Sequence, residues 1–233
     1  LPDIMPDPRL LKWTDKDLAA VTAETQLFVT EILRNNLPIQ TFIDPDFTYL
    51  NKRNAKLNGI DFPNSDTMKR VALKPGGRRG GILTQASVMM ATANGVDTQP
   101  VLRGVWLLEN ILGDPTPEPP SSVPAIEPDT TGAKSIRELL NRHKADPDCA
   151  GCHRKIDPPG FALENFDPVG RWRDHYPVYK GKGDNVIRED GLPVDTVGIL
   201  ENGTTLNDVT DLKRYLVENI DVFGNCLAEK LLV

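Results

Sequence analysis

Apolar residues recur at helical spacing near the beginning of the chain. Between residues 14 and 35 they fall along one stripe: Leu18, Val21, Phe28 and Ile32. This pattern predicts an amphipathic helix with one buried face. Thr14 is the predicted N-cap, because its hydroxyl can accept a hydrogen bond from the first turn.

Three further segments before residue 113 carry helical signals. FTYLNKRNAKLNG (47–59) follows Asp44 and Pro45, and Gly59 is placed to end it. The others are ILTQASVMMATA (82–93) and PVLRGVWLLENILG (100–113). In the last of these, one face is predicted to hold Val101, Val105, Leu108 and Leu112. Residues 1–113 are therefore expected to form a helical domain.

Residues 114–133 form the predicted linker. Six prolines stand in the sixteen residues from Asp114 to Asp129. Proline removes a backbone donor and fixes φ, so this density forbids a helix and favours an extended chain.

Residues 134–233 again carry helical patterns, but with predicted β-hairpins between them. Ser135 and Glu138 form a capping box at the start of one helix, and residues 207–220 and 223–233 carry two more helical patterns. Between them, Asp190-Gly191 and Asn202-Gly203 predict turns of one or two small hairpins. The fold class is thus mainly α, with a last helix that we expect to continue beyond the end of this chain.

Charge and composition restrict the function. The formal net charge of -6 argues against a nucleic-acid binder, which would normally show a clustered basic surface. The sequence contains no apolar run long enough to span a bilayer. The chain does not begin with Met, so we expect it to be part of a longer polypeptide.

Two cysteines and a histidine, the side chains best suited to binding a metal or cofactor, stand together in the pentapeptide Cys149-Ala-Gly-Cys152-His153. Cys-x-x-Cys-His is the pattern for covalent attachment of haem c, in which two thiols add to the vinyl groups and the adjacent imidazole coordinates iron. One covalent haem c, with His153 as iron ligand, is therefore the predicted cofactor.

Two other uses of these residues compete with haem attachment. A redox disulfide requires the motif at a strand-to-helix turn of a βαβ unit, and the surroundings show no parallel-sheet pattern. A zinc site requires two further ligands, for which Cys226, His143 and His175 remain, none at paired spacing.

The residues after His153 are suited to enclosing a haem. The predicted cofactor contacts are Pro159, Phe161, Leu163, Arg171 and Trp172. The aromatic and aliphatic side chains provide apolar walls, the Pro158-Pro159 segment can present a carbonyl to the second ring nitrogen of His153, and arginine forks suit haem propionates. A solvated surface role for Arg171 and Arg173 stays open.

Much of the chain resembles a known family. Residues 149–173, the LNRHKADPD segment before them and residues 192–233 look like the C-terminal part of the large secreted cytochrome-c-like proteins abundant in planctomycetes. Residues 24–60 and 78–120 are similar to the domain that precedes it there. The resemblance implies a haem and an extracytoplasmic location but names no reaction.

The sixth iron ligand is left open. No Met follows residue 90, whereas small cytochromes take one from downstream of the motif. Met89 or Met90 could supply a thioether, although Met more commonly fills a helix core. His143, familiar at this place in the family, and His175 are further candidates, and a five-coordinate iron is the remaining one.

Three functions follow from these alternatives. The first is electron transfer outside the cytoplasm, to a redox partner protein or to other parts of a larger polypeptide or complex. The second is a peroxidase-like enzyme with an open sixth position, and the third is a structural haem in a cell-surface interaction protein.

Overall fold

The chain is mainly α-helical with small antiparallel strand pairs, as predicted. The computed structural model describes residues 6–8, 12–62, 64–117, 135–143, 147–181 and 187–232, without the side chains of residues 139, 142, 143, 147 and 148. The elements up to residue 113 are α1 (Asp15–Arg34), η1 (Ile39–Phe42), β1 (Phe47–Leu50), α2 (Lys52–Asn58), β2 (Lys69–Ala72), η2 (Ile82–Thr84), α3 (Ala86–Ala91), α4 (Pro100–Leu107) and η3 (Leu108–Leu112). Those after residue 134 are α5 (Ile136–His143), α6 (Pro147–Phe161), β3 (His175–Lys180), β4 (Ile187–Pro193), β5 (Gly198–Ile199), β6 (Thr205–Leu206), α7 (Val209–Glu218) and α8 (Ile220–Leu231).

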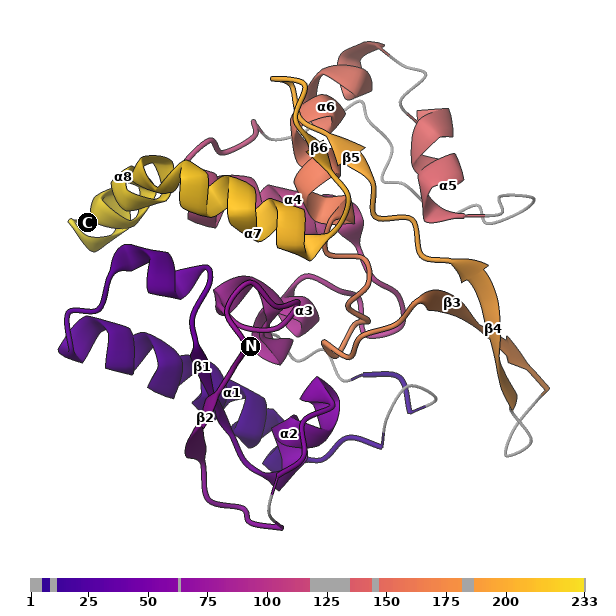
Figure 1. Ribbon diagram of the computed structural model, residues 1–233. Coiled ribbons are helices and arrows are strands. Elements are labelled where there is room, and N and C mark those ends of the chain that lie inside the picture. The colour runs from indigo at the N-terminus through magenta and orange to yellow at the C-terminus, as the bar shows by residue number, and fades with distance from the viewer. Residues whose placement is uncertain are drawn as a thin grey trace.

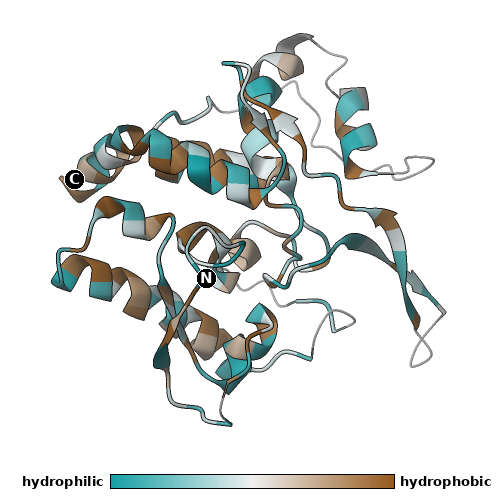
Figure 2. Ribbon diagram, in the orientation of Figure 1, coloured by the Kyte–Doolittle hydropathy of each residue, from teal (hydrophilic) through white to brown (hydrophobic). Residues whose placement is uncertain are grey.

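The predicted first helix is confirmed as α1, with Thr14 at its N-cap. The Thr14 backbone N–H donates to the Asp17 carboxylate at 2.9 Å, which occupies one of the donors that a helix start leaves unpaired. Val21, Phe28 and Ile32 are buried on one side. Figure 2 shows apolar and polar segments alternating along this helix and along α7.

The helix predicted for residues 47–59 is only half correct. Phe47–Leu50 forms β1, which pairs antiparallel with β2. Aromatic and β-branched residues pack well on a pleated surface, which explains the strand. The helix starts after Asn51, whose side chain accepts hydrogen bonds from the Arg53 and Asn54 backbone N–H groups, and it ends at Gly59 with φ 64° as expected.

The buried face of α4 and η3 also differs from the prediction. Val101, Val105 and Leu112 are only partly buried. Leu108 is buried as predicted, but the residues that share the covered side with it are Arg103, Gly104, Leu107 and Ile111. The reason is close packing on α6, because a Cβ on Gly104 would lie 2.0 Å from the Ile156 carbonyl oxygen.

The hairpins are confirmed, with one turn misplaced. β3 pairs with β4 and β5 pairs with β6, both antiparallel. Gly203, at φ 86°, lies in the turn between β5 and β6 as predicted. Asp190-Gly191 does not form a turn but lies within β4, where Asp190 is opposite Pro177. The β3–β4 ribbon projects from the body of the molecule (Figure 1).

One hydrophobic core joins the regions on either side of the predicted linker. The cluster combines Phe28 of α1 and Met89 of α3 with Leu163 and Phe166 after α6 and with Leu212 of α7. Most of the linker, residues 118–134, lies outside the described residues, so the domain limits at 113 and 134 stay predictions. The shared core nevertheless holds the segment that follows α6 against α1, α3 and α7.

Candidate functional site

Helix α6 carries the two thiols and the imidazole of the predicted motif. Cys149 and Cys152 are partly buried and His153 is buried. Side chains three and four positions apart neighbour one another on a helix, so Cys149 is next to both Cys152 and His153. In the part of the chain that the structure describes, the cysteines form no disulfide. The structure thus brings together the three groups that haem attachment requires.

The imidazole of His153 is held by a carboxylate. Nδ1 of His153 lies 2.8 Å from Oδ1 of Asp157, one helical turn further on, and the two residues are only 8% and 4% exposed. A histidine that binds a metal through one nitrogen commonly donates from the other to such a group. In such an arrangement, Nε2 is the ring nitrogen that would bind a metal.

The carbonyl predicted from Pro158-Pro159 is replaced by this carboxylate. Both prolines continue α6 and do not form an extended segment after it. A carbonyl inside a helix points along the helix axis, whereas the side chain at the fourth position after His153 returns to the same face. Pro159, a predicted cofactor contact, is buried inside this helix.

A cavity of about 620 Å³ opens beside His153. Its walls come from α6, from the start of α5 and from the β5 segment, and they comprise Arg137, Ala150, His153, Arg154, Asp157, Pro158, Val197, Gly198, Ile199, Leu200 and Glu201. Figure 1 shows β5 alongside α6, with α5 nearby. The volume falls within the range of about 300–1,000 Å³ that is usual for cofactor sites.

Gly198 allows the β5 segment, which forms the cavity wall facing α6, to lie close to that helix. A Cβ on Gly198 would lie 2.5 Å from the Pro158 Cα, so a larger residue would push β5 away. The neighbouring Val197 and Ile199 side chains are 47% and 63% exposed. These apolar side chains border the cavity and offer the kind of surface that a macrocycle covers.

Two arginines line the same cavity. Nη2 of Arg137 lies 3.0 Å from Oδ1 of Asp195, and its guanidinium lies 3.8 Å from the centre of the Phe161 ring. Arg154 follows His153 directly and is exposed. Guanidinium groups form paired hydrogen bonds with carboxylates; Asp195 occupies the guanidinium of Arg137, so Arg154 is the arginine of this wall that suits an acidic ligand group.

Several predicted contacts lie elsewhere. Phe161 is fully buried beneath Arg137, and Leu163 belongs to the central core. Nε of Arg171 lies 2.8 Å from Oδ2 of Asp167, and Arg171 and Trp172 border a separate pocket of about 280 Å³. Leu163, Trp172 and Arg171 therefore do not line the cavity beside His153.

Sequence reasoning missed Asp157, Arg137, Arg154 and residues 197–201. Asp157 and Arg154 carried a signal, since one stands four residues after His153 and the other adjoins it. Arg137 and the β5 segment carried none, because only the tertiary fold brings them to α6.

Three of the candidate sixth ligands, Met89, Met90 and His175, are not among the described residues that line this cavity. Met89 is fully buried in the central core, and Met90 packs with Val21 and Leu57 in a second cluster. His175 begins β3 opposite Pro193. His143 ends α5, but its side chain lies outside the described residues.

A buried ion network fixes the segment that follows α6. Nη1 of Arg103 donates to the Leu163 carbonyl at 2.8 Å and to Oε1 of Glu164 at 3.2 Å. Oε2 of the same carboxylate accepts from Thr98 and Arg173. Burial lowers the pKa of Arg103 to about 10, which leaves it charged at neutral pH. This network joins α4 to the segment directly after α6 and so helps to hold the helix that carries the site in position.

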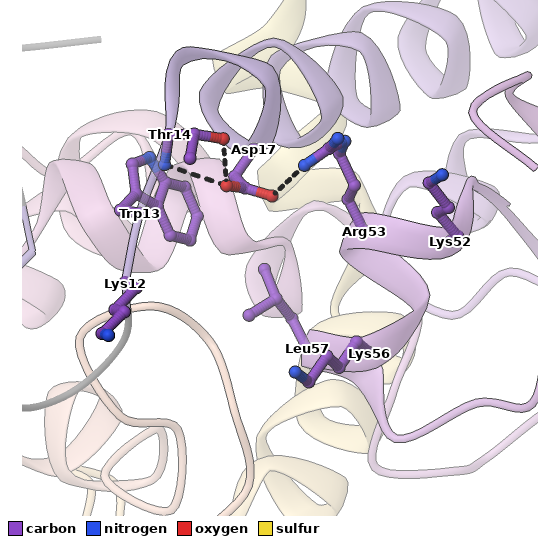
Figure 3. Close-up of a pocket in the computed structure, with 8 residues that line it drawn as sticks. All are labelled: Lys12, Trp13, Thr14, Asp17, Lys52, Arg53, Lys56 and Leu57. Atoms are coloured by element: carbon purple, nitrogen blue, oxygen red, sulfur yellow. Dashed lines mark hydrogen bonds and ion pairs between the residues drawn. The ribbon is translucent and has the colours of Figure 1, made fainter. Parts of the chain in front are cut away.

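A second cavity lies between the start of α1 and α2. It measures about 340 Å³ and is lined by Lys12, Trp13, Thr14, Asp17, Lys52, Arg53, Lys56 and Leu57. Figure 3 shows Leu57 directed toward the Trp13 ring and Arg53 paired with Asp17, at 3.1 Å. Neither a thiol nor an imidazole lines it, so it does not compete as the haem site.

The described residues do not form a zinc site. No three His, Cys, Asp or Glu side chains among them lie together as metal ligands would. Cys226 is engaged elsewhere: it lies on the buried side of α8, and its Sγ is 3.6 Å from the Glu109 carbonyl oxygen.

Two family models match separate parts of the chain. Residues 79–176 match PSCyt3, described as a protein of unknown function (DUF1588). Residues 1–60 match PSD4, described as a protein of unknown function (DUF1592). Both families are typical of planctomycete-type, cytochrome-c-like proteins with several domains. The first match contains α4, α6 and the whole Cys149–His153 motif.

The remaining comparisons add no relative. None of the curated proteins and none of the solved structures matches the chain. Among the described helices, none combines the length and apolar character that crossing a lipid bilayer requires.

Proposed function

We propose that this chain binds one haem c covalently and transfers electrons outside the cytoplasm. The observation that carries the proposal is the His153 imidazole, held by Asp157 beside the cavity and next to Cys149 and Cys152 on one helix. The likeness to families typical of cytochrome-c-like proteins supports it. The iron would supply reversible one-electron exchange with a redox partner protein.

Each residue of the site has a part in this function. Cys149 and Cys152 would hold the haem through thioether bonds to its two vinyl groups. Nε2 of His153 would bind the iron, and Arg154, which borders the cavity next to His153, would pair with a propionate.

The apolar part of the cavity would exclude water from one side of the haem once the haem covers it. Val197 and Ile199 border the cavity from β5, and Gly198 lets them stand close to α6. Covering these two exposed side chains removes apolar surface from water and so contributes to binding. Lower polarity around an iron centre also changes its reduction potential.

Expression in a bacterial periplasm equipped for cytochrome c maturation tests the proposal. The purified chain should carry haem through denaturing electrophoresis and show a sharp, low-spin α band when reduced. Cys149→Ala and Cys152→Ala should each lose one thioether bond, whereas Cys226→Ala, which alters a thiol on α8, should keep both. Haem that is retained equally after both motif cysteines are replaced would contradict the proposal.

A peroxidase-like enzyme is the second candidate. The burial of Met89 and Met90 in hydrophobic clusters favours it, because neither thioether lies at the cavity to close the sixth position. A high-spin spectrum and rapid binding of carbon monoxide by the reduced protein would select the enzyme. A low-spin spectrum insensitive to carbon monoxide would select the electron carrier.

A further inference from the structure

The contact between His153 and Asp157 has a more specific consequence for the proposed haem. We propose that Asp157 is a positioning residue, which fixes His153 in the tautomer with the proton on Nδ1 and lowers the reduction potential of the iron. The second part of this inference rests on the proposed function, whereas the first concerns the polypeptide alone.

The hydrogen bond defines the tautomer. Oδ1 of Asp157 lies 2.8 Å from Nδ1 of His153, and an ionised carboxylate can only accept. Nδ1 must therefore carry the proton, which leaves the Nε2 lone pair directed away from the contact. The nitrogen that binds a metal is selected by the hydrogen bond that the other nitrogen makes.

Burial strengthens this contact. Asp157 is 4% exposed and His153 is 8% exposed, so little water competes for the carboxylate. Attraction between a carboxylate and an imidazole proton grows as the surrounding dielectric constant falls. The contact should therefore persist in solution.

Packing of α6 holds the carboxylate in place. The carbonyl oxygen of Ile156, the residue before Asp157, would lie 2.0 Å from a Cβ on Gly104, and a Cβ on Gly160 would lie 2.0 Å from the Pro100 carbonyl oxygen. Both contacts clamp α6 against α4. The helical turn that carries His153 and Asp157 is thus constrained before any cofactor binds.

A charged acceptor affects iron more than a neutral carbonyl does. A carboxylate draws the Nδ1 proton toward itself and makes the imidazole a stronger electron donor. A stronger donor stabilises the ferric form, so the reduction potential falls. The proposed carrier would therefore work at a lower potential than one whose histidine donates to a carbonyl.

The tautomer can be measured in the haem-free chain by ¹⁵N NMR of the histidine rings at alkaline pH. We expect His153 to be protonated on Nδ1 in the wild type and to shift toward the Nε2–H form in Asp157→Ala. Glu201→Gln, on the opposite wall of the same cavity, is the matched control and should leave the tautomer unchanged. A wild-type His153 protonated on Nε2 would overturn the inference without any variant.

The potential is measured on haem-loaded protein. Asp157→Asn and Glu201→Gln each remove one negative charge from the cavity wall, but only the first removes it from the His153 contact. We expect a larger upward shift of the midpoint potential for Asp157→Asn, and a value near wild type for Asp157→Glu. Equal shifts for Asp157→Asn and Glu201→Gln would overturn the effect on potential. A chain that takes up no haem would refute the proposed function and leave the tautomer result standing.

Discussion

Arg103 and Glu164 form an ion pair at 3.2 Å in which both side chains are fully buried. The two residues come from α4 and from the turn after α6, so the pair links segments on either side of the predicted linker. Removing one partner of a buried pair leaves the other charge without compensation in a region of low dielectric constant.

Replacement of this carboxylate should be costly. Glu164→Gln leaves Arg103 charged and buried, and we expect it to lower the free energy of unfolding by about 3–5 kcal/mol, measured by urea denaturation. The control is Glu189→Gln, which breaks an exposed pair with Lys180 and should cost about 1 kcal/mol or less. Equal losses in the two variants would show that Arg103 finds other compensation.

The approach of α4 to α6 makes a second prediction. Gly104→Ala places a methyl group against the Ile156 carbonyl and should destabilise the protein by about 1–3 kcal/mol. Gly151→Ala, on the open side of α6, meets no atom within 4 Å and should be neutral or stabilising by up to about 1 kcal/mol. Denaturant unfolding of the two variants compares a methyl group added at a tight helix contact with one added in solvent. A Gly104→Ala protein as stable as the wild type would show that α4 and α6 can move apart to accept the methyl group.

Glu24 gives a pH dependence of stability. Burial raises its pKa from 4.5 to about 7, despite hydrogen bonds from Thr48 and Asn54. The folded state then holds a proton that the unfolded state has released. Its contribution is fully present below about pH 4.5 and is lost as the pH rises through about 7.

Glu24→Gln removes this titration. Its unfolding free energy should lack the wild-type decline, by up to about 3 kcal/mol, between roughly pH 4 and pH 8. The quantity to compare is the slope of the unfolding free energy against pH, because the Gln amide also alters the contact with Asn54 and so changes the absolute stability. Parallel pH curves for wild type and variant would contradict the raised pKa.

Met89 is expected to act as a core residue. Met89→Leu should keep the optical spectrum of the loaded protein and change the stability by less than about 1.5 kcal/mol, since it conserves apolar volume. Loss of a low-spin α band in this variant would instead identify Met89 as an iron ligand.

Local signals in the sequence predicted much of the secondary structure. Thr14, Gly59 and Ser135 mark helix ends because capping depends on neighbouring backbone groups, and the Glu138 N–H does donate to Ser135 Oγ at 3.1 Å. Phe47–Leu50 and Asp190-Gly191 were misassigned because strand pairing with distant residues decided their conformation. Tertiary pairing overrides such short patterns.

The site was predictable only on α6 itself. The spacing of Cys149, Cys152 and His153 is a local chemical pattern, and Asp157 stands one helical turn beyond it. Arg137 and Val197 reach the cavity through the packing of α5 and β5. The guanidinium of Arg171, a predicted cofactor contact, is paired with Asp167 in the folded chain, a contact that the sequence pattern did not indicate.

Intact-mass spectrometry of the denatured, purified chain tests the central claim most directly. After periplasmic expression with a cytochrome c maturation system, the proposal predicts the polypeptide mass plus one haem, with fragment ions that place both thioether bonds at Cys149 and Cys152. The bare polypeptide mass, from cells that load a co-expressed cytochrome c fully, would contradict it.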